Sequence, residues 1–455
     1  MLQLYNALFL GFVRYSLPVM GNTCKTNLRV LQGLQAQALR TCLGLPKCAS
    51  TAATIVIAGE HPMTTYITTD SLRAHIRHLA RVPSHHLAYL PAERPRTTFS
   101  NIIAAHTTSL PTNYTPAARP SSPLWCLHRP EVRLNIPGVT KKKRMSSVAL
   151  KQAALLHLHE VYSAHTHIYT DGSVTATSST AAVIIPASSV TIQLKMFYST
   201  STTAAELVAL RAALQFVIEQ TPNSWAIFCD SKAALQSLPS ALRHGSHEQL
   251  VAEIRQVHHD IIEKGHQVIF QWMPSHCGIQ GNDQADAAAR SAHDGVSSVA
   301  IPLSRSDAAK ELRVLARRLT LDLWHSPTYT SARLHTLDPD LKLRIPSGLS
   351  RRHSTLLARL WLGVAFSNAY SFLIGMSDSP LCEVCGCSET VAHLLCDCTR
   401  FNSERDTLSA ALRQLDNRPL TEFKILGPWP TRSATRAALR ALLRFLEATG
   451  LSEKL

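Results

Sequence analysis

The chain has 455 residues, which is too long for one compact core and indicates two to four domains. Hydrophobic residues make up 45% of it, a fraction typical of globular proteins that argues against a wholly disordered chain. Its formal net charge of +15 predicts a polyanionic partner.

The positive charge is unevenly distributed. Residues 161–295 hold seven lysines and arginines against eleven aspartates and glutamates, a net charge of −4, so the flanking segments carry +19. Attraction to a phosphate backbone is therefore expected to come mostly from outside this central stretch.

The cysteine pattern and the first twenty residues indicate the expected cellular location. Eleven cysteines, five of them between positions 382 and 398, do not form the pattern of a secreted disulfide scaffold. The apolar start, Met1 to Met20, is interrupted by Arg14 and has no basic leading region or small-residue cleavage site. We expect no signal peptide, no membrane partner, and a nuclear or cytoplasmic location inside the cell.

Residues 1–82 have a helical pattern. Leu4, Leu8 and Phe12 form one apolar face, and an amphipathic helix over 28–43 ends at Gly44 and Pro46. The run from Leu31 to Arg40 resembles the thumb of a non-LTR retrotransposon reverse transcriptase, which implies an upstream reverse-transcriptase module as a partner. Polymerase activity is not expected, since the chain lacks two adjacent aspartates. A generic helical hairpin is the alternative.

Residues 83–160 are rich in proline, serine and threonine and are interpreted as a linker. The linker contains the basic run Lys141-Lys142-Lys143-Arg144, typical of a nuclear-localisation or phosphate-contact patch, or of a merely solvated segment.

Residues 161–295 hold four acidic residues in distinctive settings. One follows the strand at Ile168, where a turn is expected; one lies in the first turn of a helix that Thr202 or Thr203 can cap; one ends the strand 225–228; and one lies near a helix start. Such positions can converge on one edge of a sheet. The four residues are Asp171, Glu206, Asp230 and Asp286.

The stretch from Trp272 to Asp286, Trp-Met-Pro-Ser-His-Cys-Gly-Ile-Gln-Gly-Asn-Asp-Gln-Ala-Asp, completes a resemblance to type 1 ribonuclease H domains. That resemblance implies a mixed five-stranded sheet flanked by helices and hydrolysis of the RNA strand of RNA–DNA hybrids. It also implies that Asp171 bridges two metal ions, that the other three acids complete their shells, and that His276 assists proton transfer. The alternative is that these residues are ordinary caps and turns.

The chemistry explains why carboxylates are needed there. Four of them packed together resist ionisation unless cations neutralise them, and hard oxygen ligands suit Mg²⁺, or Mn²⁺ in its place. Two such ions can activate a water and stabilise the leaving oxygen of an in-line displacement. Between Ser237 and Glu248 the chain lacks the basic, tryptophan-containing substrate handle of some family members.

Residues 305–380 are expected to form a basic helical segment. A leucine-faced helix spans 306–324, and Arg351, Arg352 and Arg359 are candidate phosphate contacts. The alternative is that these helices only cover the neighbouring domain.

Residues 381–400 contain a second candidate metal site, Cys382-x₂-Cys385-x₇-His393-x₄-Cys398. Three thiolates and an imidazole make a tetrahedral ligand set for structural Zn²⁺. The spacing resembles the CCHC-type motif near the end of many non-LTR retrotransposon polyproteins. Cys387 and Cys396 are alternative ligands, and free or redox-active thiols are the other interpretation. Residues 401–455 are expected to be a helical tail.

The predicted fold class is α/β, a ribonuclease H-like sheet with helical N-terminal and C-terminal segments. The preferred function is metal-dependent endonucleolytic cleavage of RNA in hybrids, as part of a retrotransposon polyprotein. The alternative is an inactive nucleic-acid-binding remnant that uses the basic flanks and zinc segment. A relative that cuts DNA or DNA junctions with the same carboxylates is a third reading.

Overall fold

A computed structural model of the chain describes residues 2–20, 24–81, 97–106, 123, 125–139, 145–239, 247–295, 298–330 and 332–455. The chain divides into two compact units. The first combines Met1–Leu72 with Arg313–Leu455, and the second is Arg73–Leu312. The basic run at 141–144 and most of the connection between Ser237 and Glu248 lie outside the described residues.

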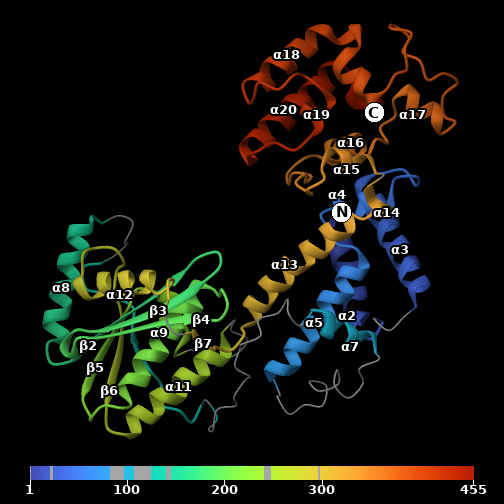
Figure 1. Ribbon diagram of the computed structural model, residues 1–455. Helices are drawn as coiled ribbons and strands as arrows, with labels where there is room; N and C mark the ends of the chain where they lie inside the picture. The colour runs from blue at the N-terminus through green and yellow to red at the C-terminus, as the bar shows by residue number, and fades with distance from the viewer. Residues whose placement is uncertain are drawn as a thin grey trace. The chain divides into compact units, whose positions relative to one another are not determined.

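The second unit is built on a mixed sheet of seven strands in the order β1-β6-β5-β2-β3-β4-β7 (Figure 1). Strands β1, β6, β5 and β2 run parallel, β3 is antiparallel to both β2 and β4, and β7 is parallel to β4. The strands are β1 (Glu131–Arg133), β2 (Thr166–Val174), β3 (Ser179–Ile185), β4 (Val190–Met196), β5 (Ser224–Cys229), β6 (Gln267–Trp272) and β7 (Ser298–Val299).

This sheet confirms the predicted α/β class. The five central strands, β2 to β6, are those expected from the sequence, and the short strands β1 and β7 are added at the two edges. The helices and short helical turns of the unit are α7 (Thr98–His106), α8 (Ser147–Tyr162), η4 (Pro186–Ser188), α9 (Thr202–Val217), α10 (Lys232–Ser237), α11 (Glu248–Glu263) and α12 (Gln280–Ser291).

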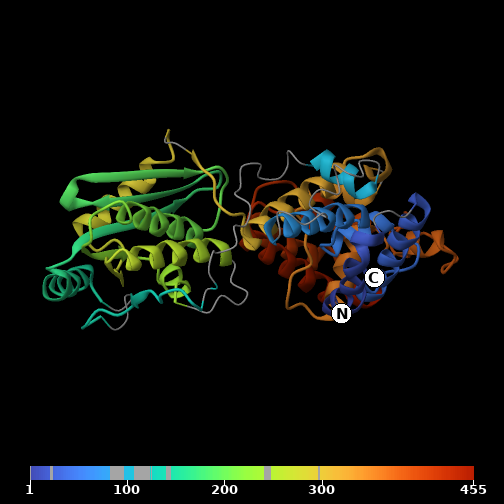
Figure 2. The same ribbon diagram turned by 90° about the horizontal axis from the view of Figure 1, so that it is seen from below.

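Helices α9 and α12 cover opposite faces of the sheet (Figures 1 and 2). A side chain at Gly172 would point toward α9, whereas the ring of Tyr169 lies against Gly281 of α12. Residues three apart in a strand point to opposite faces, so the two helices enclose β2 from both sides. Strand β3 is accordingly buried along its whole length.

The helix starts are fixed by serine caps. The hydroxyl of Ser201 accepts from the backbone N–H of Ala204, and that of Ser231 accepts from Ala234. The cap of α9 is therefore Ser201 and not Thr202 or Thr203, which places Glu206 at the fifth helical position, just beyond the first turn.

The first unit is helical. Its core joins α3 and α4 near the N-terminus to α16 and α20 near the C-terminus, and the largest buried side chains in it are Trp324 and Trp361. The elements are α1 (Leu2–Leu4), η1 (Tyr5–Leu10), α2 (Gly11–Met20), α3 (Lys25–Leu43), α4 (Thr51–Ile57), α5 (Met63–Arg81), α13 (Arg305–Trp324), α14 (Pro327–Thr330), α15 (Arg333–Leu337), α16 (Arg351–Leu362), α17 (Asn368–Leu373), η5 (His393–Asp397), η6 (Thr399–Phe401), α18 (Asn402–Arg413), α19 (Glu422–Leu426), α20 (Arg432–Ala448) and α21 (Leu451–Lys454). Helices α5 and α13 contribute residues to both units.

Helix α3 ends where the sequence predicts, because Gly44 adopts a left-handed φ of +67° that terminates it. The guanidinium of Arg359 on α16 donates to the backbone oxygens of Gly44 and Leu455. Three of its five N–H donors are thus used to hold two parts of the first unit together, and a contact between Arg359 and phosphate stays a prediction.

In the described part of the chain, none of the helices is both long and apolar enough to cross a membrane.

Candidate active site

Asp171 lies inside β2, where it pairs with Ala182 of β3. The turn expected at Asp171-Gly172 is not formed, because the strand continues to Val174. Gly172 is needed because a Cβ there would lie 2.6 Å from the backbone nitrogen of Glu206. This close approach of β2 to α9 brings Asp171 and Glu206 together from elements far apart in sequence.

Glu206 and Asp230 come to the same place from α9 and from the end of β5. The side chain of Glu206 is buried, with the Cys229 thiol 3.6 Å from its Oε2. Asp230 follows β5 directly, and the indole N–H of Trp272 donates to its backbone oxygen at 3.0 Å. Carboxyl ends of neighbouring parallel strands meet at one sheet edge, which is where these acids converge.

The three carboxylates form a tight cluster. Asp171, Glu206 and Asp230 each offer an oxygen, and these oxygens all lie within 4.8 Å of one another. Burial and the charges of Asp230 and Asp286 raise the pKa of Asp171 to about 7. Burial, with the charges of Asp230 and Asp171, raises the pKa of Glu206 well above its usual range.

Asp286 and His276 lie beside this cluster. Asp286, on α12, contributes to the raised pKa of Asp171, but it is not among the three acids whose oxygens lie within 4.8 Å of one another. Its Oδ2 is 2.5 Å from Arg290 and 3.5 Å from the His276 Nδ1. His276 has a left-handed φ of +54° and its side chain is 67% exposed, so the ring is accessible to a bound substrate.

The donor set fits divalent cations. Three carboxylates this close, two of them buried, repel one another, so their ionised forms need positive charge nearby. The only donors in the cluster are carboxylate oxygens, which suit Mg²⁺ or Mn²⁺ better than soft metals.

A pH dependence follows from the raised pKa of Asp171. Without divalent cations, the folded protein retains a proton that the unfolded chain releases near pH 4. The stabilisation that this proton contributes is therefore fully present below pH 4 and is lost as pH rises to about 7. We expect the free energy of unfolding to fall by up to about 1.4 kcal/mol per pH unit in this window.

Denaturant titrations in chelator at several pH values measure this fall in the free energy of unfolding. Asp171→Asn should flatten the slope and Mg²⁺ should restore stability at pH 7, whereas a wild type without a slope would contradict the site's electrostatics.

Gly281 at the start of α12 also shapes the site, because a Cβ there would overlap the ring of Tyr169. We expect Gly281→Ala to push α12 from the sheet, to destabilise the domain by about 1–3 kcal/mol, and to impair the site through Asp286. Denaturant unfolding measures the loss. Gly33→Ala in α3 is the control, since a Cβ there meets nothing within 4 Å and alanine favours the helix.

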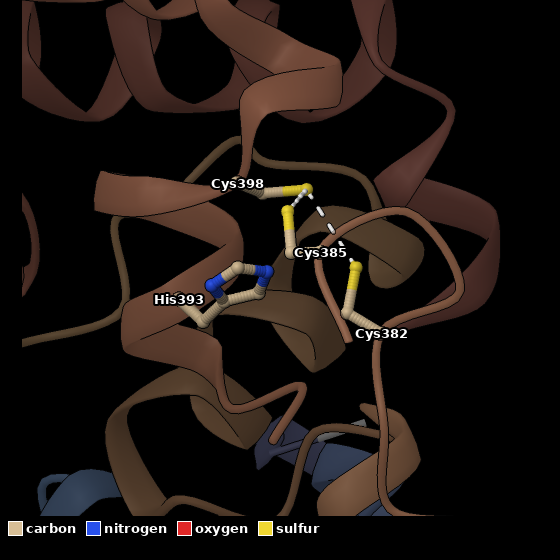
Figure 3. A group of neighbouring side chains, drawn as sticks. All are labelled: Cys382, Cys385, His393 and Cys398. Atoms are coloured by element: carbon tan, nitrogen blue, oxygen red, sulfur yellow. Dashed lines mark hydrogen bonds between the residues drawn. The ribbon is translucent and has the colours of Figure 1, made fainter. Parts of the chain in front are cut away.

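A second cluster lies in the first unit, where the sulfurs of Cys382, Cys385 and Cys398 and the ring of His393 turn toward a common point (Figure 3). One ligand atom from each lies within 4.8 Å of the others, and the Cys398 sulfur is 3.9 Å from each of the other two. A tight turn positions the first pair, with the backbone N–H of Gly386 donating to the oxygen of Cys382 at 2.8 Å.

The neighbouring cysteines differ in placement. Cys396 is outside the four-residue group, and burial raises its pKa to about 11. Cys387 is exposed, although its sulfur lies 3.3 Å from the His393 Nδ1. The geometry thus favours the set Cys382, Cys385, His393 and Cys398 over sets that include Cys387 or Cys396.

Several residues around the acids were not predicted from the sequence. Arg290 pairs with Asp286 at i, i+4 spacing on α12, a signal that was available in the sequence. Lys232 lies over the Trp272 ring at 3.9 Å, and Lys151 of α8 lies along Gly278. The last two contacts join elements distant in sequence, so no local pattern could have revealed them.

Comparison with known families agrees with this geometry. The family model described as RNase H matches residues 163–294, which contain the acid cluster, His276 and Asp286. A search of curated proteins gave no match for the chain. Residues 163–294 are therefore an RNase H domain. This assignment supports nuclease activity on RNA–DNA hybrids.

Proposed function

We propose that this chain is a type 1 ribonuclease H, a metal-dependent endonuclease that hydrolyses the RNA strand of RNA–DNA hybrids. The observation that carries the proposal is the convergence of Asp171, Glu206 and Asp230 within 4.8 Å, from two strands and a helix. The match of residues 163–294 to the RNase H family supports it.

The acids divide into two environments. Asp171 and Glu206 are buried and would hold cations deep at the sheet edge, whereas Asp230 and Asp286 are partly exposed and would face the substrate side. Divalent cations bound there would supply Lewis-acid stabilisation of the phosphate and a water activated for attack.

The contacts of His276 support a role in proton transfer. Its exposed imidazole lies 3.5 Å from Asp286, which can orient the ring through Nδ1 and leave Nε2 for the substrate side. Arg290 pairs with the same Oδ2 of Asp286 and would offset part of the negative charge that this carboxylate adds beside the cluster.

Binding of a polyanionic substrate needs basic side chains, whereas residues 161–295 carry a net charge of −4. Lys151 is exposed, and its ammonium lies 3.3 Å from the position a Gly278 Cβ would occupy, two residues from His276. In the described residues it has no acidic partner. It is therefore available to a phosphate next to the reacting one.

We expect Lys151→Ala to raise KM severalfold, to leave kcat nearly unchanged, and to reduce the salt dependence of hybrid binding by about one phosphate contact. Binding and steady-state cleavage over a salt series measure this. Lys264→Ala is the control, because that ammonium donates to the backbone oxygen of Ile218 instead. If hybrid binding has the same salt dependence in the wild type, Lys151→Ala and Lys264→Ala, that result would contradict a phosphate contact by Lys151.

We further propose a retrotransposon polyprotein context, with an upstream reverse-transcriptase module as partner and nuclear or cytoplasmic action. The sequence resemblances at residues 31–40 and 382–398 support it. The cysteine–histidine cluster would then hold a structural Zn²⁺ within the first unit.

The test is cleavage of a labelled RNA–DNA hybrid with Mg²⁺, beside matched double-stranded RNA and double-stranded DNA. Cleavage of the hybrid's RNA strand alone is the expected result. Binding of the hybrid without cleavage by the folded protein would instead indicate a nucleic-acid-binding remnant, and cleavage of the DNA would indicate a different nuclease.

A further inference from the structure

A third cluster of metal-binding donors lies in the second unit, apart from the acids and the cysteines. It consists of His128, His259 and Glu263, and one ligand atom from each lies within 4.8 Å of the others. His259 and Glu263 share one face of α11 at i, i+4 spacing, while His128 comes from the segment just before β1.

Contacts within this cluster bring the three donors together. The His128 Nε2 lies 2.7 Å from the Glu263 Oε1, and the two imidazole rings are 4.9 Å apart between centroids. The backbone N–H of His128 donates to the His259 Nδ1 at 3.3 Å. These contacts hold side chains that are 131 positions apart in the sequence.

The segment that carries His128 is anchored on both sides. Leu127 and Ile136 are buried, and β1 pairs with β6 through residues such as Glu131 and Ile269. His128 therefore has a fixed backbone position above α11, so binding an ion would order few additional groups.

We propose that His128, His259 and Glu263 form a binding site for a transition-metal ion, with Zn²⁺ as the preferred occupant. Two imidazoles and one carboxylate are intermediate between hard and soft donors, and this set suits Zn²⁺ better than Mg²⁺. The side chains of His128 and Glu263 are 47% and 61% exposed, which leaves room for water ligands. The ion would fasten the segment before β1 to α11, a structural role independent of the proposed nuclease activity.

The test compares Zn²⁺ binding by the full chain with binding by His128→Ala and Glu263→Gln, both at exposed positions. We expect each variant to lose one weakly held ion, or to bind it about tenfold more weakly or worse, while the cysteine cluster stays loaded. Substituted Co²⁺ separates the sites, since thiolate ligands give intense charge-transfer absorption that imidazole and carboxylate do not.

His335→Ala is the matched control. Its imidazole lies 3.4 Å from the His325 Nδ1 in another histidine pair, which is not part of any three-donor group within the described residues. This variant should keep the wild-type number of bound ions.

A second readout distinguishes a metal site from a simple ion pair. If His128 and Glu263 only pair with each other, both variants should lose the same thermal stability with and without Zn²⁺, and that result would overturn the proposal. With the cysteine cluster already loaded, a metal site at His128 instead predicts that further Zn²⁺ raises the melting temperature of the wild type and not that of the variants. Wild-type zinc affinity in both variants would overturn it as well.

Discussion

Asp171→Asn should abolish hybrid cleavage, lowering kcat by about a thousandfold or more, while the protein stays folded and still binds the hybrid. Asp171 is a buried acid whose carboxylate oxygen lies within 4.8 Å of oxygens of both Glu206 and Asp230. Removal of its charge would weaken cation binding and remove several kcal/mol of transition-state stabilisation. Cleavage at saturating hybrid, over a Mg²⁺ series, measures the effect.

The fold should tolerate this change. Burial already raises the pKa of Asp171 to about 7, so a neutral amide removes repulsion without removing a stabilising charge. Asp283→Asn is the control, because Asp283 is an exposed acid at the start of the same helix as Asp286. Cleavage by Asp171→Asn within tenfold of wild type would rule out a central role for this carboxylate.

Cys398→Ser should release zinc and destabilise the first unit by on the order of 4 kcal/mol or more, while the RNase H domain stays folded. Cys382 and Cys398 are buried within the unit's hydrophobic core, so loss of the ion also disturbs its packing. The buried guanidinium of Arg405 donates to the backbone oxygens of Leu395 and Cys398, which ties the cluster to α18.

Zinc content and hydrogen exchange of the full chain measure this prediction. We expect faster exchange in α16, α18 and α20 and unchanged exchange in β2, β3 and β5. Cys396→Ser is the matched control, because Cys396 lies outside the four-residue group and should leave both zinc and exchange unaltered. Equal zinc content in Cys398→Ser and wild type would show that this thiol is not a ligand.

The sequence by itself determined the central fold and the order of the acids. Strand and helix periodicities are local properties, so β2 to β6 and α9 to α12 could be predicted from residues near one another. The acids at residues 171, 206, 230 and 286 were identified because their motifs are short and follow a fixed order. The four-ligand spacing at residues 382–398 was recognisable for the same reason.

Only the tertiary structure decided which side chains meet. The approach of Gly172 to Glu206 and the position of Lys151 along Gly278 depend on how helices pack on the sheet. The extra edge strand β1 and the grouping of His128 with α11 join segments more than 100 residues apart. The shared core of N-terminal and C-terminal helices in the first unit is also long-range. Local patterns carry no information about such contacts, because packing selects them only once whole elements are formed.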